Sequence, residues 1–147
     1  MFVSLTRLRI RSLPAWFEFV RKNEGAVRQV VTSPGFVRGK LMVDGFRTFW
    51  TMTVWDDERS TRAYRGSGTH GAVMGNLARW CDEASVAHWT QDNDELPDWR
   101  EAHRRMCAEG RASPVDHPTV DHQNRRIRPP RVFVQRPLAP RSSFSAP

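Results

Sequence analysis

The sequence predicts an α+β domain in which strands and helices follow the order β-α-β-β-α-β, with one further helix at the end. Three observations support this prediction. Residues 48–55 (TFWTMTVW) are rich in aromatic and β-branched side chains, which favour a strand. Apolar residues recur every three to four positions in residues 13–31, as in an amphipathic helix. Asp44-Gly45, between two apolar runs, is typical of a hairpin turn.

Each predicted element has a signal of its own. Ser12 is a good N-cap for the first helix, and Pro14 is tolerated in its first turn. Gly25 weakens the middle of this helix and suggests close packing there. Residues 33–35 (SPG) end it, and Asp57 begins a later, short helix. The predicted strands are 2–10, 36–43, 48–55 and 84–91, and the other helices are 69–82 and 97–109.

This order is that of the ferredoxin-like fold, a four-stranded antiparallel sheet with two crossover helices on one face. In residues 48–55, Phe49 and Trp55 point to one face, and Trp50 and Met52 to the other, so both faces are apolar. The last helix is mostly polar and is expected on the surface. We therefore expect the second face to be open and to form the interface of a homodimer.

The chain is predicted to divide at about residue 110. Residues 1–109 hold 16 Lys and Arg against 14 Asp and Glu, whereas residues 110–147 hold 7 Arg, 2 Asp and 7 of the 10 prolines. We therefore expect a folded domain at 1–110 and a tail at 111–147 that is disordered or wraps loosely. Within it, residues 131–135 (RVFVQ) are compatible with a short added strand or with a strap on a partner. Since most of the basic charge lies in the tail, the domain itself is not expected to bind nucleic acid.

Several classes of protein are disfavoured. The N-terminus lacks the continuous apolar run of a secretory signal or a membrane span, so a soluble, cytoplasmic protein is expected. Cys81 and Cys107 have neither a metal-ligand spacing nor a disulfide pattern, and the five histidines show no metal-ligand spacing. There is no catalytic carboxylate pair, nucleophile triad or phosphate-binding loop, which disfavours hydrolases and kinases.

His70 is the candidate functional residue. In the helix predicted at 69–82 it lies on the same apolar stripe as Val73, Leu77 and Trp80. Its place in the first turn disfavours a positive charge, so a neutral imidazole is expected. The alternative is a structural histidine that hydrogen-bonds a carbonyl group. Core packing is likewise the alternative role for four tryptophans, namely Trp50, Trp55, Trp80 and Trp89.

Three segments resemble one family of proteins. They are residues 34–36 (PGF), residues 49–57 (FWTMTVWDD) and residues 68–74 (GTHGAVM). Together they resemble the antibiotic-biosynthesis-monooxygenase-like proteins of the dimeric α+β barrel superfamily, over about residues 1–109. The resemblance implies a homodimer, and a role in secondary metabolism as an oxidoreductase. It also implies a pocket between the sheet and its crossover helices that takes a small apolar or aromatic ligand.

The resemblance implies a monooxygenase that acts on an aromatic, polyketide or polyene substrate without a cofactor. His70 would then be the catalytic base. The substrate-binding residues would include Met74, Trp80 and whichever of Trp50/Met52 or Phe49/Trp55 face the helices. Relatives that bind haem suggest an alternative in which His70 is the axial iron ligand. Two further alternatives are a non-catalytic, ligand-binding or stress-type dimer and a nucleic-acid-associated protein that uses the arginine tail.

Overall fold

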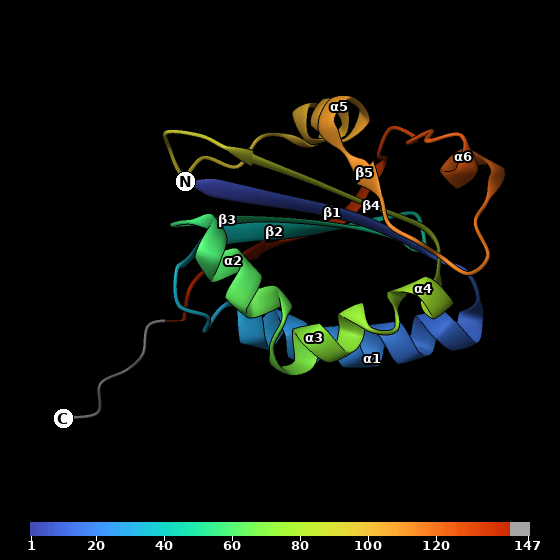
Figure 1. The fold of residues 1–147 in the computed structure, drawn as a ribbon, viewed down its shortest axis with the longest axis horizontal. Helices are drawn as coiled ribbons and strands as arrows, with labels where there is room; N and C mark the ends of the chain where they lie inside the picture. Colours follow the sequence, from blue (N-terminus) through green and yellow to red (C-terminus); the bar gives the residue numbers. More distant parts are fainter. Residues whose placement is uncertain (142–147) are drawn as a thin grey trace.

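The computed structural model describes residues 1–141. Its centre is an antiparallel sheet of six strands (Figure 1). The order across the sheet is β5-β4-β1-β3-β2-β6. The prediction of four strands was wrong, because β5 and β6 add one strand at each edge. The strands are β1 (Phe2–Ile10), β2 (Phe36–Asp44), β3 (Thr48–Trp55), β4 (Cys81–Thr90), β5 (Arg111–Ala112) and β6 (Val132–Leu138). The four central strands have the predicted ferredoxin-like order.

Four helices cover one face of the sheet: α1 (Leu13–Val30), α2 (Glu58–Arg65), α3 (Gly68–Met74) and α4 (Leu77–Trp80) (Figure 1). The predicted caps are present, because the Ser12 side chain accepts from the N–H of Ala15 and Asp57 accepts from the N–H of Ser60. The single helix predicted at 69–82 is instead two short helices. It breaks at Gly75, the C-cap of α3, and β4 already begins at Cys81.

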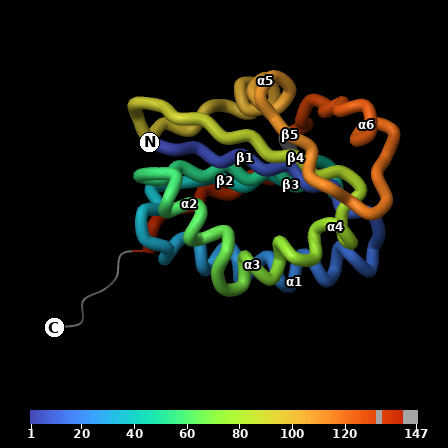
Figure 2. Tube along the Cα trace, in the orientation of Figure 1, coloured from blue at the N-terminus to red at the C-terminus, as the bar shows by residue number. Residues whose placement is uncertain are grey.

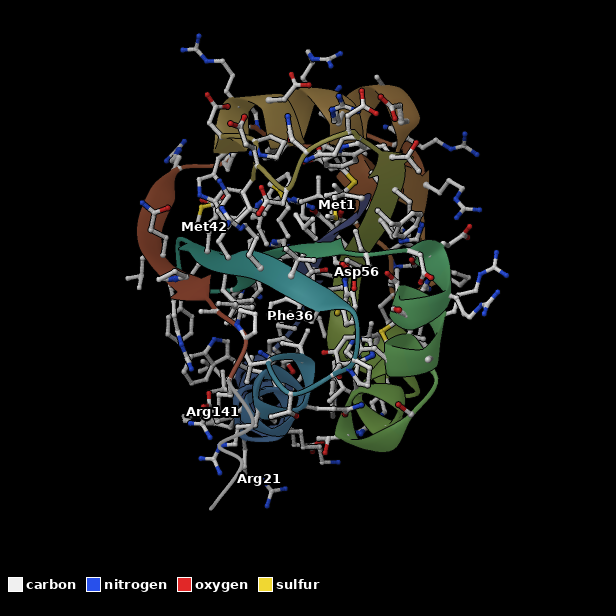
Figure 3. The ribbon with its side chains drawn as sticks, turned by 90° about the vertical axis from the view of Figure 1, so that its left-hand side faces the viewer. Met1, Arg21, Phe36, Met42, Asp56 and Arg141 are labelled. Carbon is white, nitrogen blue, oxygen red and sulfur yellow. The ribbon has the colours of Figure 1, made fainter. Side chains whose placement is uncertain are left out.

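The second face of the sheet is covered by α5 (Trp99–Glu109) and α6 (Val120–Gln123) (Figures 1 and 2). The apolar side chains of α5 pack against those of the central strands in one buried cluster: Val3, Leu5, Met42, Trp50, Met52, Val54, Ala87, Trp89, Trp99, Ala102 and Met106. In side view Met42 lies on the α5 side and Phe36 on the α1 side (Figure 3). The prediction of an open second face was therefore wrong, because the stripe of Trp99, Ala102 and Met106 on α5 is sufficient to cover it.

The segment 111–138 supplies the strand at each edge of the sheet. Strand β5 pairs with β4 through Ser85 and Val86, and β6 pairs with β2 from Gly39 to Asp44. The strand expected at 131–135 is thus present as β6, on this chain's own sheet. Residues 142–147, the end of the predicted tail, lie outside the described residues. No helix within residues 1–141 has both the length and the apolar character needed to cross a membrane.

The close approach of α1 and α3 depends on one glycine. A Cβ atom added at Gly25 would lie 2.6 Å from Cγ2 of Thr69, which is well inside van der Waals contact. The close packing suggested for Gly25 is therefore confirmed. This contact fixes α3, and with it His70, against α1 and beneath the sheet.

Candidate functional site

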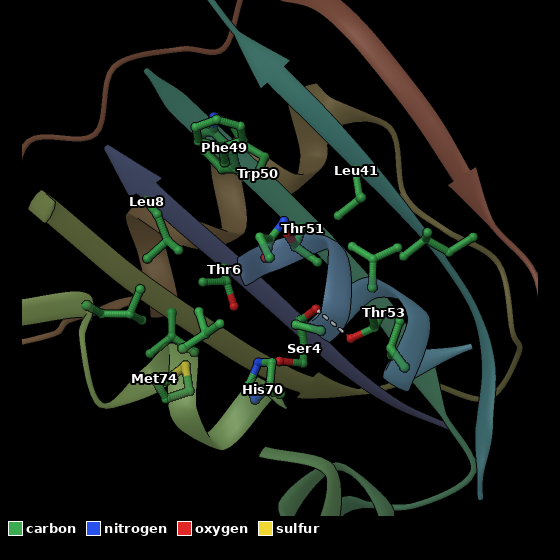
Figure 4. Close-up of a pocket in the computed structure, with 18 of the residues that line it drawn as sticks. Ser4, Thr6, Leu8, Leu41, Phe49, Trp50, Thr51, Thr53, His70 and Met74 are labelled. Carbon is green, nitrogen blue, oxygen red and sulfur yellow. Dashed lines mark hydrogen bonds between the residues drawn. The ribbon is translucent and has the colours of Figure 1, made fainter. Parts of the chain in front are cut away.

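A cavity of about 340 Å³ lies between the sheet and the helices of the first face. Its walls come from the strands β1, β2, β3, β4 and β6 and from the helices α1, α2, α3 and α4 (Figure 4). Its size is at the lower end of the range for small-molecule pockets. The lining is mostly apolar, with Leu8, Phe19, Val27, Leu41, Phe49, Val73 and Met74 among its members. The cavity is thus suited to a small, largely apolar ligand.

Four hydroxyl side chains form the floor of the cavity on the two central strands. In the register of β1 with β3, Ser4 is opposite Thr53 and Thr6 is opposite Thr51. Since alternate residues of a strand share one face, all four side chains point to the helices. The Thr53 hydroxyl donates to the Ser4 carbonyl and accepts from Nε1 of Trp55 at 2.9 Å. Within residues 1–141, the hydroxyls of Thr6 and Thr51 have no protein partner and remain available to a ligand.

His70 is half-buried in the cavity wall, where α3 faces this floor (Figure 4). Its Nδ1 atom lies 3.3 Å from the Arg65 carbonyl oxygen. A carbonyl can only accept, so Nδ1 carries the proton of the neutral ring and Nε2 has a free lone pair. Burial lowers the pKa of His70 below its ordinary value of 6.5, with the Arg65 carbonyl opposing this shift and the Arg65 charge adding to it. The neutral imidazole expected from the sequence agrees with this lowered pKa, but the main cause is burial rather than the helix dipole.

Two neighbouring side chains hold His70 in place. The ring of Tyr64 packs against the imidazole with 4.2 Å between centroids, and its hydroxyl donates to the Ala26 carbonyl on α1. Burial raises the pKa of Tyr64 above its ordinary value of 10.0, so the phenol stays protonated. The side chain of Gln29 accepts from the backbone N–H of His70 at 2.9 Å and donates to the carbonyl of Ser67 at 3.0 Å. The orientation of His70 is therefore set by contacts with both α1 and α2.

The cavity contains some of the predicted site residues and not others. His70, Trp55 and Met74 line it, and Trp50 also borders it. The indole of Trp50 is mainly part of the buried cluster under α5, where it lies edge to face with Trp99. The alternative between Trp50/Met52 and Phe49/Trp55 is thus resolved in favour of the second pair.

Met52 and Trp80 are not among the cavity-lining residues. Met52 is in the cluster on the α5 side of the sheet, because it alternates with Thr51 and Thr53. Trp80 packs against Phe19, and its indole N–H donates to Glu18 at 3.0 Å. The break between α3 and α4 removes it from the stripe that it would share with His70 in one continuous helix.

Two groups of cavity residues were missed by the sequence analysis. The hydroxyl floor had a detectable signal, since Ser4 and Thr6 alternate in one predicted strand and Thr51 and Thr53 in another. The wall from β6 was missed because the possible strand at 131–135 gave no indication of where it would pair, and only its pairing with β2 brings it to the cavity. There Leu138 is buried and Arg136 lies 3.5 Å from Glu24 on α1. This ion pair joins β6 to α1 beside the cavity.

The side chains around the cavity include a candidate ligand for haem iron. No three His, Cys, Asp or Glu residues within 1–141 are grouped so as to hold a metal ion. The arrangement of His70 does suit an axial haem ligand, because Nε2 is free while Nδ1–H is held by a carbonyl. Arg65 also lines the cavity and carries a charge that suits a haem propionate, whereas the charge of Arg136 is already paired with that of Glu24. The donors present therefore suit a haem iron, but a haem is larger than the cavity of about 340 Å³ and would be enclosed only in part, whereas a small organic ligand fits whole.

Known structures share this fold at low sequence identity. A variant of SnoaB, a cofactor-independent oxygenase from Streptomyces nogalater, is 19% identical, with a TM-score of 0.52 over 66% of this chain and 97% of its own. Rv0793 from Mycobacterium tuberculosis is 9% identical, with a TM-score of 0.57 over 65% and 98%. An antibiotic biosynthesis monooxygenase is 12% identical, with a TM-score of 0.56 over 63% and 100%. The fold implied by the resemblance to the antibiotic-biosynthesis-monooxygenase-like proteins is therefore confirmed.

The sequence itself matches one family. No functionally curated protein is significantly similar to the chain. Residues 10–113, from the end of β1 to just beyond β5, match the family described as "Domain of unknown function (DUF3291)". The match spans well over half of the chain, and the chain thus belongs to the DUF3291 family.

Proposed function

We propose that this protein is a small monooxygenase that oxidises an aromatic or polyene substrate in the cavity between the sheet and α1–α3. The observation that carries the proposal is the neutral His70, which lines a mostly apolar cavity with a floor of hydroxyl groups and whose Nδ1 is occupied by the Arg65 carbonyl. The fold shared with a cofactor-independent oxygenase supports it. Oxidation without a cofactor requires an electron-rich substrate and a base. The apolar cavity can bind such a substrate, and the imidazole of His70 can act as the base.

The chemistry balances with oxygen as the only co-substrate. Nε2 of His70 removes a proton from an acidic C–H group of a phenolic substrate, and the hydroxyls of Thr6 and Thr51 donate to the oxygen that gains the negative charge. The carbanion forms a C–O bond with O₂, and the protonated His70 returns its proton to the resulting peroxide. The hydroperoxide then loses water and leaves a carbonyl group. The substrate is oxidised, and the two oxygen atoms end in the carbonyl and in water.

Oxygen uptake by the purified full-length protein tests this proposal. Anthrone is a suitable probe, because its CH₂ group is acidified by the flanking rings and its product, anthraquinone, absorbs light at a different wavelength. Enzyme-dependent oxygen uptake matched by equal anthraquinone formation is the expected result. Saturable anthrone binding without uptake would instead support the alternative of a non-catalytic ligand-binding protein.

The reaction is expected to depend on pH in one direction. His70 acts as a base only when neutral, and burial lowers its pKa below 6.5. The value of kcat/KM should therefore be constant at neutral pH and fall as the pH is lowered through a value below 6.5. Initial rates between pH about 5 and about 8 measure this profile. An inflection above 6.5 would contradict the role of a buried, neutral imidazole.

A haem-binding protein is the second candidate function, and the Nδ1–H contact of His70 with the Arg65 carbonyl favours it. When bound, the iron would supply the activation of oxygen, His70 would hold it, and Arg65 would offer a positive charge to a propionate. The absorption spectrum before and after addition of haemin tests this alternative. A sharp Soret band that disappears in His70→Ala is its expected signature, whereas anthrone oxidation with no such band supports the cofactor-free proposal.

The proposal keeps two expectations from the sequence, a cytoplasmic location and a homodimer. The interface of such a homodimer must differ from the one first expected, because α5 occupies that face of the sheet. Gel filtration with light scattering measures the oligomeric state.

A further inference from the structure

A second cavity, of about 190 Å³, lies on the opposite face of the sheet from His70. Its lining residues come from β1, β4, the end of α5 and the segment that leads through β5 to just beyond α6. The backbone of α5, β5 and α6 lies on this side of the sheet (Figure 2). Its charged lining consists of four arginines and one carboxylate: Arg7, Arg111, Arg125, Arg126 and Glu83. His122 and Cys107 also line it. The proposed oxygenase reaction uses none of these residues.

Arg7 is the buried part of this site. It is only 3% exposed, and its Nη1 donates to Glu83 at 2.6 Å. Glu83 also accepts from the hydroxyl of Thr119 at 2.9 Å. Nε of Arg7 is buried and has no hydrogen-bond partner within residues 1–141. A buried guanidinium N–H without an acceptor is costly, so an acceptor supplied by a ligand would be favourable.

The other arginines give the cavity an excess of positive charge. Within the described part of the chain, Arg111 and Arg125 have no carboxylate within ion-pair distance, and Arg126 lies 3.7 Å from Asp121. Arg125 has a φ of +54°, an uncommon conformation for a residue other than glycine. Its backbone N–H donates to the His122 carbonyl at 3.1 Å, which stabilises this turn. The turn therefore places two adjacent arginines at the rim of a cavity that already contains a buried one.

We propose that this cavity binds a phosphoryl-type oxyanion, either free phosphate or the phosphate group of a small metabolite. The planar guanidinium group donates two parallel hydrogen bonds to such an anion, and arginine is the residue that most often recognises it. The site is concave, and its most buried cation is enclosed by the sheet and the C-terminal segment. Because Arg7 lines the cavity, a small anion inside it would lie next to the buried cation, whereas a nucleic acid backbone would contact the exposed rim alone.

Thermal unfolding at increasing phosphate concentration tests the proposal, with sodium chloride at equal ionic strength as reference. Because phosphate stabilises many proteins without binding a site, the decisive quantity is the difference between variants. The double variant R111Q/R125Q should lose most of the phosphate-dependent rise in Tm. The control R59Q/R100Q removes the same charge from two exposed positions outside the cavity and should keep the rise. Equal rises in the two double variants would overturn the proposal.

Alkylation of Cys107 in the wild-type protein gives a second test, which does not depend on how a variant folds. Cys107 is exposed and lines the cavity, whereas Cys81 is buried and reacts only on unfolding. At a phosphate concentration ten times the dissociation constant about one site in eleven is empty, so iodoacetamide should react with Cys107 about tenfold more slowly. Chloride at equal ionic strength should give no protection.

The outcomes also distinguish the source of the anion. If phenyl phosphate protects Cys107 from alkylation at a lower concentration than inorganic phosphate does, the site is assigned to a phosphorylated metabolite. If inorganic phosphate protects at the lower concentration, the site is assigned to free phosphate. Equal protection by chloride would mean screening alone and would overturn the proposal. Protection by a single-stranded oligonucleotide but not by phosphate would also overturn it and would indicate a nucleic-acid-binding surface.

Discussion

Replacement of His70 by alanine is expected to slow anthrone-dependent oxygen uptake by about a hundred- to ten-thousand-fold, the usual contribution of a general base. The change removes the imidazole from the cavity wall but leaves the hydroxyl floor and the apolar walls in place. KM should change less than kcat, because the walls bind the substrate and the imidazole moves its proton. Initial rates at pH about 7.5 provide the measurement, since the imidazole is then neutral.

The matched control for this variant is His117→Ala. His117 is exposed and lines neither cavity, so its loss should leave both kcat and KM unchanged. Added imidazole should restore part of the activity of His70→Ala, because the vacated space lies on the cavity. Unchanged oxygen uptake in His70→Ala would show that His70 is a structural histidine, the simpler role that the sequence also allowed.

The second large effect is expected for Trp99→Ala, which should lower the free energy of unfolding by about 3–5 kcal/mol. Trp99 is buried between α5 and the sheet and lies edge to face with Trp50, with 6.5 Å between the ring centroids. The ammonium group of Lys40 lies 4.6 Å from the Trp99 centroid, and Gln135 on β6 accepts from its indole N–H at 3.2 Å. The substitution therefore leaves a cavity and removes contacts that join α5 to both β2 and β6.

Denaturation in urea measures this effect, with Arg100→Ala as the control on the exposed side of the same helix. The control should change the free energy of unfolding by no more than about 0.5 kcal/mol. If Trp99→Ala is no less stable than the control, α5 does not cover the second face in solution. Light scattering would then test whether that face instead forms the homodimer interface first expected.

Much of the fold could be predicted because its signals are local. The strands β1 and β3 have the predicted bounds, and α1 begins at the predicted cap with its end one residue earlier. The role of α5 was not predictable from its composition, because eight of its eleven residues contribute nothing to the buried stripe. One tryptophan, one methionine and one alanine are sufficient to cover the second face of the sheet, since an aromatic side chain buries a large area.

The place of the C-terminal segment in the fold could not be predicted from its sequence pattern. Strand β6 pairs with β2 through backbone hydrogen bonds, which any sequence can make, and an exposed sheet edge offers unpaired groups for them. Pro137 is tolerated because β6 is itself an edge strand. The segment therefore contributes to both cavities although its sequence has neither the period of a helix nor a clear alternation.

The candidate site could be predicted in part. His70, Trp55 and Met74 line the cavity as expected, because strand alternation and the first turns of a helix are robust to small errors in bounds, while their catalytic and binding roles are proposals. Trp80 was misplaced because its expected position required one unbroken helix across Gly75. The pairing of Ser4 with Thr53 and Thr6 with Thr51 depends on the register of two distant strands, which no local pattern gives.

An NMR titration of the His70 imidazole shows whether this residue is a neutral base at a ligand cavity. We expect a ring protonated at Nδ1, a pKa below 6.5, and resonances that shift when anthrone is added. A pKa of 6.5 or above, or resonances that do not respond to anthrone, would contradict it.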